Sequence, residues 1–230
     1  MSTGAPQAGS TAPVSTTYLR VQRTARIVLL GTAAPGVREL WICCHGYSQL
    51  APDFARRLAV LAAPHRLVAV PEALNRFYRD DHGGVHGPDH PVGATWMTRE
   101  ERLHEIDDYC AYLDQVYTHF AAQLPDCAYV CALGFSQGSQ TVARWASRTH
   151  CRIDRVILWG AGLPQEIMPA QGMFKGAPLT LVAGERDSFA EAGLARLTTE
   201  LGAAGVAYRV ERFSGGHRLD DETLRRIAGS

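Results

Sequence analysis

The chain has 230 residues, of which 46% are hydrophobic and 20% are charged, proportions that are typical of a globular domain with a substantial core. Its 23 basic residues balance its 23 acidic residues, which argues against a nucleic acid or an anionic membrane surface as a partner. No stretch reaches the roughly 20 consecutive apolar residues that a membrane-spanning helix requires.

Residues 1–17 consist mainly of Ser, Thr, Ala, Gly and Pro. Such a segment buries little, so we expect it to be disordered, followed by a single domain over residues 18–230. It has neither the basic n-region nor the apolar h-region of a signal peptide. We therefore expect a cytoplasmic protein with reduced thiols. No C-x-x-C pair indicates a metal cluster among the cysteines, which are Cys43, Cys44, Cys110, Cys127, Cys131 and Cys151.

Short β-like runs alternate with longer helical patterns. The predicted strands cover residues 17–22, 26–31, 39–46, 66–72, 128–136, 155–162, 178–187 and 206–213. The predicted helices cover residues 52–63, 98–123, 137–149, 189–203 and 220–228. The first two strands are expected to form an antiparallel hairpin at the sheet edge, and the inner strands are almost continuously apolar. This pattern predicts the α/β class, with a mostly parallel central sheet flanked by helices on both faces.

The segment Gly134-Phe135-Ser136-Gln137-Gly138 matches the pattern G-x-S-x-G. It lies between a predicted strand and a predicted helix, which is the context that this motif requires. Glycines at both ends allow a tight turn that exposes the serine hydroxyl at the positive end of the helix dipole. We therefore predict that Ser136 is a nucleophile.

A nucleophilic serine needs a general base and an acid that orients it, and in this motif's fold they follow in the order serine, acid, histidine. Asp187 and His217 follow two later predicted strands, so both belong to the strand ends where open α/β sheets place their sites. Glu185 is a less suitable acid because Asp187 lies at the end of its predicted strand. Asp220 suits the N-cap of the last predicted helix better.

Two backbone N–H groups are expected to form an oxyanion hole. One is that of Gln137, the residue after the nucleophile, and the other is assigned to Tyr47 in the loop after an early strand. His45 is expected to brace this loop. The similar segment around Ser48 lacks the final glycine of the motif, so Ser48 is rejected as the nucleophile.

The stretches HGYSQ, GFSQGS, GERD and SGGH together resemble the phospholipase/carboxylesterase family of α/β-hydrolases over roughly residues 39–220. The resemblance implies the α/β-hydrolase fold, a catalytic triad of Ser136, Asp187 and His217, and no cofactor. It also implies that the polar connection 73–97 covers the active site and that Trp96 matches a tryptophan of the family. Where members often have HGLGD, this chain has HGYSQ.

From the same connection, Phe77, Tyr78, Trp96 and Met97 are expected either to line an acyl pocket or to anchor the connection to the core. Leu50 is a further candidate for substrate binding. Asp80, Asp81, His82, His86, Asp89 and His90 also lie here. The glycines and prolines among them favour a solvated polar loop, with a metal-binding loop as the alternative.

The expected function is hydrolysis of small to medium acyl esters through an acyl-enzyme. Thioesters, lysophospholipids or lactones are alternative substrates for the same triad, and an inactive ligand-binding protein is the alternative that is not an enzyme. The expected partner is a small-molecule ester, and the chain is expected to be a monomer or a homodimer.

Overall fold

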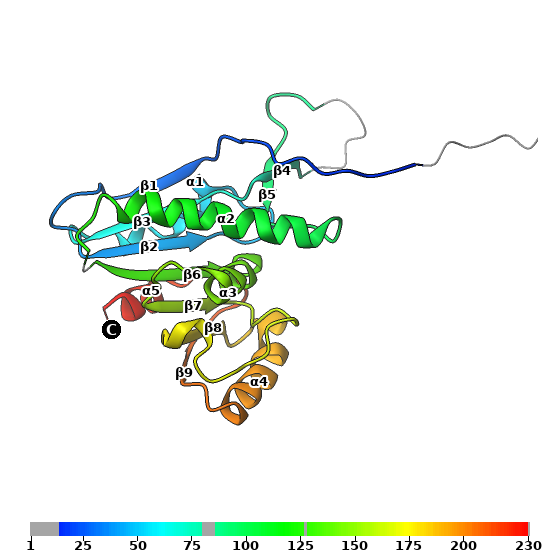
Figure 1. The fold of residues 1–230 in the computed structure, drawn as a ribbon. Coiled ribbons are helices and arrows are strands. Elements are labelled where there is room, and N and C mark those ends of the chain that lie inside the picture. Colours follow the sequence, from blue (N-terminus) through cyan, green and yellow to red (C-terminus); the bar gives the residue numbers. More distant parts are fainter. Residues whose placement is uncertain (1–13, 80–85, 127, 230) are drawn as a thin grey trace, which may run out of the picture.

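The structure is a computed structural model that describes residues 14–79, 86–126 and 128–229. Its main feature is a seven-stranded sheet with the order β1-β3-β2-β6-β7-β8-β9 (Figure 1). The strands are β1 (Ile27–Leu30), β2 (Glu39–Cys44), β3 (Arg66–Pro71), β6 (Tyr129–Phe135), β7 (Arg155–Trp159), β8 (Leu179–Gly184) and β9 (Tyr208–Phe213). Only β1 pairs antiparallel with its neighbour within this sheet. The predicted, mostly parallel α/β sheet is therefore confirmed.

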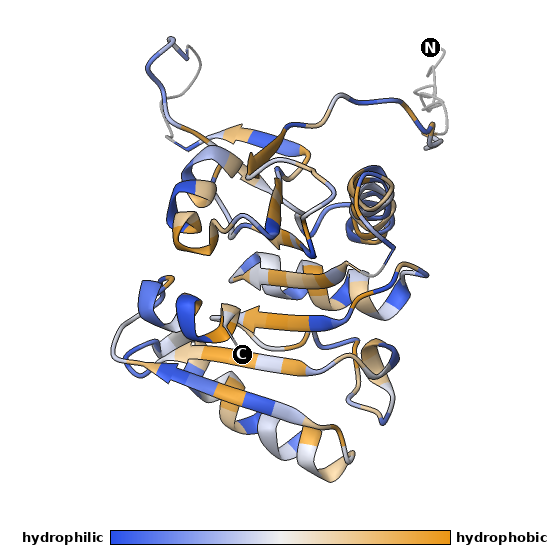
Figure 2. Cartoon of the chain, turned by 90° about the vertical axis from the view of Figure 1, so that its left-hand side faces the viewer, coloured by the Kyte–Doolittle hydropathy of each residue, from blue (hydrophilic) through white to orange (hydrophobic). Residues whose placement is uncertain are grey.

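Helices cover both faces of the sheet, as predicted. They are α1 (Ala51–Arg57), α2 (Arg102–Ala121), α3 (Gln137–Arg148), α4 (Ser188–Ala203) and α5 (Asp221–Ala228), with short 3-10 turns η1 (Ala59–Leu61) and η2 (Met173–Gly176). Figure 2 shows helices on both sides of the sheet, with hydrophobic residues concentrated in the strands. Among the described residues, no helix is both long and apolar enough to cross a membrane.

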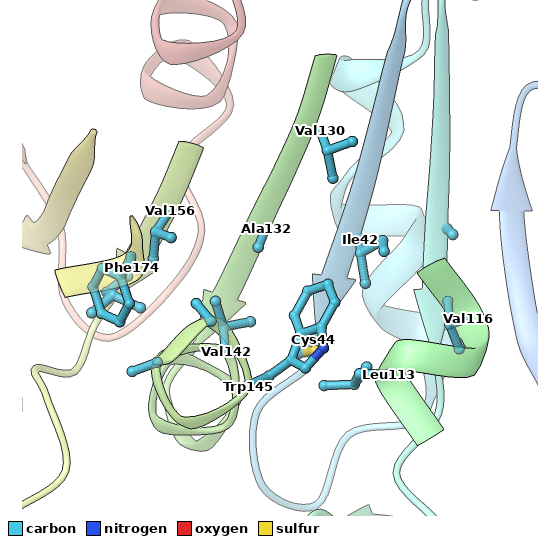
Figure 3. Packing of buried hydrophobic residues seen from close by; sticks show 14 of the residues in the cluster. Ile42, Cys44, Leu113, Val116, Val130, Ala132, Val142, Trp145, Val156 and Phe174 are labelled. Atoms are coloured by element: carbon cyan, nitrogen blue, oxygen red, sulfur yellow. The ribbon is translucent and has the colours of Figure 1, made fainter. Parts of the chain in front are cut away.

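Alternation along the strands explains the two layers of core. In β2, Ile42 and Cys44 face α2 and α3, whereas Trp41 and Cys43 face α1 and α5, because successive side chains of a strand point to opposite faces. Figure 3 shows the first layer, in which Trp145 of α3 and Leu113 of α2 pack against strand residues. Both layers contain fully buried tryptophans, which contribute much of the apolar area removed from water.

The N-terminal part of the fold differs from the prediction. Residues 17–22 form no strand, and the expected edge hairpin is wrong, since β1 pairs with β3 instead. Leu19 and Val21 are 86% and 81% exposed, so the apolar alternation there has no core to face. Residues 1–13 of the segment expected to be disordered lie outside the described part of the chain.

The helix ends were predicted less accurately than the helices themselves. The helix expected over residues 52–63 ends at Arg57 and continues as the η1 turn, and the helix expected from residue 98 begins at Arg102. By contrast, α5 begins as predicted, with Asp220 as its N-cap accepting a hydrogen bond from the N–H of Thr223 over 3.1 Å.

The long connection 73–97 contains a two-stranded antiparallel hairpin, β4 (Asn75–Tyr78) and β5 (Val92–Thr95). The hairpin is attached to the turn after β2, where the N–H of Ser48 donates to the carbonyl of Ala94 over 2.9 Å. The backbones approach so closely that a Cβ on Gly93 would lie 2.8 Å from the carbonyl oxygen of Ser48. The hairpin is thus part of the edge at which β2 and β6 end.

Candidate active site

The glycines around Ser136 are required by the geometry of the turn between β6 and α3. Ser136 has φ 54° and ψ −119°, a strained conformation for a residue with a side chain. A Cβ on Gly134 would lie 2.2 Å from the carbonyl oxygen of Gly138, and a Cβ on Gly138 would lie 2.1 Å from that of Cys44. The Ser136 N–H donates to the carbonyl of Trp159 over 2.8 Å. The strand, turn and helix therefore present the Ser136 hydroxyl at the sheet edge.

His217 and Asp187 lie next to this hydroxyl. His217 Nε2 is 2.8 Å from Ser136 Oγ, and His217 Nδ1 is 2.7 Å from Asp187 Oδ2. With the carboxylate accepting the Nδ1 proton, the Nε2 lone pair is directed at the serine hydroxyl. The Asp187 side chain is 2% exposed and that of His217 is 35% exposed, so the carboxylate is shielded from water while the imidazole remains accessible.

The sheet topology brings these three residues together. Ser136 follows β6, Asp187 follows β8 and His217 follows β9, and these parallel strands all end at one edge. The His217 ring packs against Phe135 with the ring centroids 5.0 Å apart. Gly160, with φ +70°, leaves room for the imidazole, since a Cβ there would lie 2.9 Å from His217 Cε1.

The turn of residues 45–51, called the 45–51 turn below, lies beside the serine. A Cβ on Gly46 would be 3.2 Å from Ser136 Cβ. Within the turn, the N–H groups of Gly46, Ser48 and Gln49 donate to Gln49 Oε1 and to the carbonyls of Ala94 and Gly46, respectively. No acceptor among the described residues takes the Tyr47 N–H. Gln137, the first residue of α3, has an N–H that a helix leaves unpaired.

His45 braces the turn, as predicted. Its ring is buried, with Nδ1 2.8 Å from the carbonyl oxygen of Gly46 and Nε2 accepting the N–H of Ala73 over 3.0 Å. Because Nε2 must accept, the proton of the neutral ring lies on Nδ1 and is donated to Gly46. Burial lowers the pKa of His45, which keeps the ring neutral in this role.

Neither a protein-family model nor a curated protein matches the chain. Among solved structures, esterase PE8 is similar with 18% identity and a TM-score of 0.68, over 89% of this chain and 96% of that one. The phospholipase/carboxylesterase from Dyadobacter fermentans is similar with 18% identity and a TM-score of 0.63, over 90% and 96%. Acyl-protein thioesterase 2 from Zea mays is similar with 16% identity and a TM-score of 0.64, over 90% and 97%.

The chain has the α/β-hydrolase fold. These neighbours include a phospholipase/carboxylesterase, the family that the motifs of the sequence resemble. Ser136, Asp187 and His217 follow β6, β8 and β9, so they occur along the chain in the order serine, aspartate, histidine. This is the order in which the α/β-hydrolase fold carries its triad residues.

The residues expected to bind substrate take different places in the structure. Trp96 is 2% exposed, and its indole N–H donates to the carbonyl of His45 over 2.8 Å, so it supports the 45–51 turn. Phe77 is half-buried and stacks on Tyr47 with the ring centroids 5.3 Å apart. Met97 and Leu50 are half-buried and pack against the larger core layer.

The side chain of Gln137 has a structural role that the sequence did not indicate. Its amide oxygen accepts the N–H of Trp96 over 3.1 Å, and its amide nitrogen donates to Thr95 Oγ1 over 2.9 Å and to the carbonyl of Met97 over 3.1 Å. The first residue of α3 thus ties the end of β5 to the turn that carries Ser136. No sequence pattern indicates this contact, because its partners are 40 to 42 residues away.

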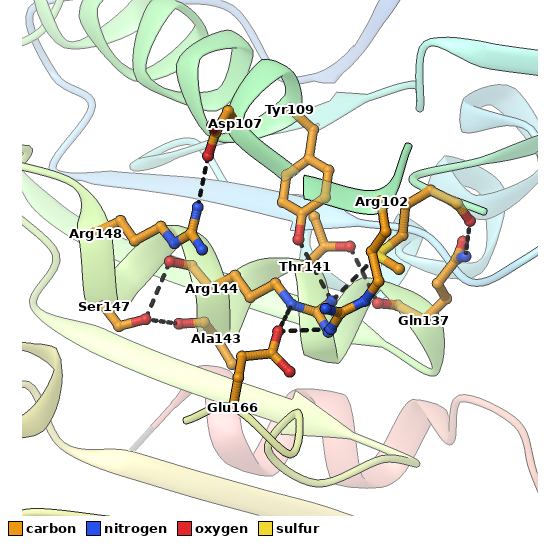
Figure 4. A network of polar contacts seen from close by, with 11 residues as sticks. Arg102, Asp107, Tyr109, Gln137, Thr141, Ala143, Arg144, Ser147, Arg148 and Glu166 are labelled. Atoms are coloured by element: carbon orange, nitrogen blue, oxygen red, sulfur yellow. Dashed lines mark hydrogen bonds and ion pairs between the residues drawn. The ribbon is translucent and has the colours of Figure 1, made fainter. Parts of the chain in front are cut away.

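A charged network holds the loop that follows β7, as Figure 4 shows. Arg144 of α3, whose side chain is almost fully buried, donates through Nε to Glu166 over 2.6 Å, and Arg102 donates to the same carboxylate over 2.8 Å. Arg144 also lies 3.4 Å from the Tyr109 hydroxyl. Partial burial alone would raise the pKa of Glu166, but the hydrogen bonds of the two arginines, a backbone hydrogen bond and the charge of Arg144 outweigh it and lower the pKa to about 2.

The His/Asp-rich part of the connection is only partly described. Asp80, Asp81 and His82 lie outside the described residues. His86 stacks on Tyr78 with the ring centroids 3.8 Å apart, and the Nδ1 atoms of His86 and His90 are 3.1 Å apart. Within the part of the chain that the structure describes, no group of three or more ligating side chains suits a metal ion.

Two cavities lie elsewhere on the molecule. One, of about 1220 Å³, lies between residues 18–25 and α2, and the other, of about 590 Å³, lies between η2 and the start of β9. Neither is lined by Ser136, Asp187 or His217. The cluster of Ser136, Asp187 and His217 at the sheet edge is therefore separate from both cavities.

Proposed function

We propose that this chain is a serine hydrolase that cleaves carboxylic esters of small to medium acyl chains through an acyl-enzyme, as a member of the phospholipase/carboxylesterase family. The observation that carries the proposal is the continuous line of hydrogen bonds from Asp187 through His217 to Ser136, with distances of 2.7 and 2.8 Å. The strained backbone of Ser136 adds support, because strain of this kind is typical of the nucleophile turn of such enzymes.

In the proposed reaction, Ser136 Oγ attacks the ester carbonyl carbon while His217 Nε2 takes the hydroxyl proton. The buried Asp187 carboxylate holds the imidazole and stabilises its charged form. When the tetrahedral intermediate collapses, the bond to the alkoxy oxygen breaks and His217 returns the proton to the leaving alcohol. Water then attacks the acyl-serine with the same base, releasing the carboxylic acid and restoring the Ser136 hydroxyl.

The N–H groups of Tyr47 and Gln137 are proposed to bind the oxyanion of both intermediates. Gly46 brings the first of them beside Ser136, and the start of α3 supplies the second at the positive end of the helix dipole. In comparable sites, one such donor contributes about 3 kcal/mol to transition-state stabilisation.

The accessibility of the site supports the proposal that the substrate is an ester that binds from solution. Ser136 is half-buried and His217 is partly exposed. The stacked rings of Tyr47 and Phe77 offer an aromatic surface beside the 45–51 turn. We propose that Phe77, with Met97 and Leu50, contacts the substrate and that Trp96 supports the oxyanion donor from behind.

The test is turnover of p-nitrophenyl esters of increasing acyl length, together with labelling by a fluorophosphonate. Wild-type protein should hydrolyse the acetate or butyrate, and Ser136→Ala should abolish both turnover and labelling. Ser147→Ala, which removes a hydroxyl bonded only within α3, is the matched control and should retain both. A wild-type protein that neither turns over esters nor is labelled would overturn the proposal in favour of a ligand-binding protein.

A further inference from the structure

Two consecutive residues, Glu72 and Ala73, hold both ends of the 45–51 turn. At its start, Nε2 of His45 accepts the N–H of Ala73 over 3.0 Å. At its end, the N–H of Ala51 donates to Glu72 Oε2 over 3.0 Å. Both holding residues directly follow β3, the neighbour of β2 in the sheet. The turn is therefore fastened to the end of an adjacent strand at two points.

The Glu72 carboxylate is built into the fold as an anion. Its residue is 1% exposed, and it accepts hydrogen bonds from Arg26 Nε over 3.0 Å and from Arg76 Nε over 2.6 Å. Burial alone would raise the pKa of Glu72, but the hydrogen bonds of Arg26, Arg76 and the Ala51 N–H outweigh it and lower the pKa. An ionised carboxylate has only acceptor atoms, so it can accept from Arg26, Arg76 and the Ala51 N–H together.

The contact to Ala51 replaces a missing helix cap. Ala51 is the first residue of α1, and its N-cap is Leu50, whose side chain has no acceptor for the free N–H groups of the helix. Glu72 supplies that acceptor from another strand, with a negative charge at the positive end of the helix. Without it, the start of α1 and the residues that lead into it would have one fewer fixed point.

We propose that Glu72 is a positioning residue, which acts through the ends of the 45–51 turn to hold the Tyr47 N–H toward the oxyanion on Ser136. The inference deepens the proposed function and rests on it, since an oxyanion donor matters only in a hydrolase. Glu72 does not touch the reacting atoms. Its effect is expected on transition-state stabilisation, since ester binding in the ground state does not require an aligned N–H.

The variant that tests this is Glu72→Gln, which keeps the shape but removes the charge and two acceptor positions. We expect kcat on p-nitrophenyl butyrate to fall about 10- to 100-fold, as for a misplaced catalytic group, with KM nearly unchanged. The inhibition constant of an alkyl boronic acid, whose serine adduct places an oxygen in the oxyanion hole, should rise by the same factor. The pKa of the general base in the pH–rate profile should stay the same.

A second measurement does not depend on activity. In hydrogen–deuterium exchange, Glu72→Gln should speed exchange in peptides covering residues 45–51, which are more than 20 positions away in sequence. The matched control is Glu39→Gln, which breaks the ion pair of Glu39 with the buried Arg66 at the opposite end of β2. That variant should leave kcat, boronate inhibition and exchange in the 45–51 turn unchanged.

If Glu72→Gln does not fold, Arg76→Gln carries the test, because Arg76 is 44% exposed and contributes one of the bonds to Glu72. It should show the same changes at smaller size. Unchanged exchange in the turn, or faster exchange with unchanged kcat and boronate inhibition, would overturn the positioning role. A wild-type chain without esterase activity would instead overturn the proposed function, and the exchange experiment would still decide whether Glu72 holds the turn.

Discussion

Asp187 and His217 are joined at 2.7 Å across a separation of 30 residues, with the carboxylate buried and the imidazole partly exposed. Asp187→Asn should therefore keep the geometry but allow the imidazole to adopt the wrong tautomer, with a fall in kcat of about 10³- to 10⁴-fold. The measurement is steady-state turnover of p-nitrophenyl butyrate. Glu185→Gln, which changes the exposed acid on the same loop, is the control and should leave kcat within a factor of two or so. The reverse ranking of the two variants would refute Asp187 as the orienting acid.

The glycine at the start of α3 should tolerate no side chain. In Gly138→Ala, the new Cβ would lie 2.1 Å from the carbonyl oxygen of Cys44, so β2 and α3 must separate, and we expect a loss of about 3 kcal/mol or more of unfolding free energy. In Gly193→Ala on α4, nothing lies within 4 Å of the new Cβ, and helix propensity predicts a gain of about 0.5–1 kcal/mol. Urea denaturation of both variants checks the pair. A stable Gly138→Ala protein would contradict the packing argument.

The Glu166 network predicts a stability loss in acid. The pKa of Glu166 is lowered from 4.5 to about 2, so the folded state binds fewer protons than the unfolded state between these values. The stabilisation from this group is fully present above pH 4.5 and is lost as the pH falls through that window. The glutamine of Glu166→Gln does not titrate, so only the wild type loses this stabilisation in acid. The melting temperatures of the two proteins should therefore converge as the pH falls from 5 to about 2. A difference that stays constant over this range would contradict the prediction.

His45 should make the protein sensitive to mild acid. Burial lowers its pKa from the ordinary value of 6.5, so the unfolded chain takes up the proton first and stability declines as the pH falls below about 6.5. Protonation would also replace the acceptor at Nε2 with a donor facing the Ala73 N–H. In His45→Gln, the amide oxygen remains an acceptor but does not titrate. Urea unfolding at pH 7 and pH 5.5 should show a smaller decline for the variant, and equal declines would argue against this role.

Local patterns predicted the parts of the site that depend on neighbours in the chain. The motif around Ser136 predicted a strand, a tight turn and a helix, because glycine requirements and hydrophobic periodicity are local properties. The polarity of parallel strands then predicted that Asp187 and His217 would end at the same edge, and the structure places them there. The positions of His45 in its loop and of Asp220 before the last helix also predicted their roles as a brace and as an N-cap.

Only the tertiary structure decided which distant groups face one another. Residues 17–22 have a strand-like pattern but form no strand. Strand pairing depends on which strand edge is unpaired, and the outer edge of β3 pairs with β1. The bond between Glu72 and Ala51, and that between Gln137 and Trp96, join residues 21 and 41 positions apart. Such contacts arise when the packing of sheet and hairpin brings buried donors to acceptors that must satisfy them. The G-x-S-x-G motif is thus a local property of the sequence, whereas the support of the 45–51 turn, which carries the proposed oxyanion donor, is a property of the packed fold.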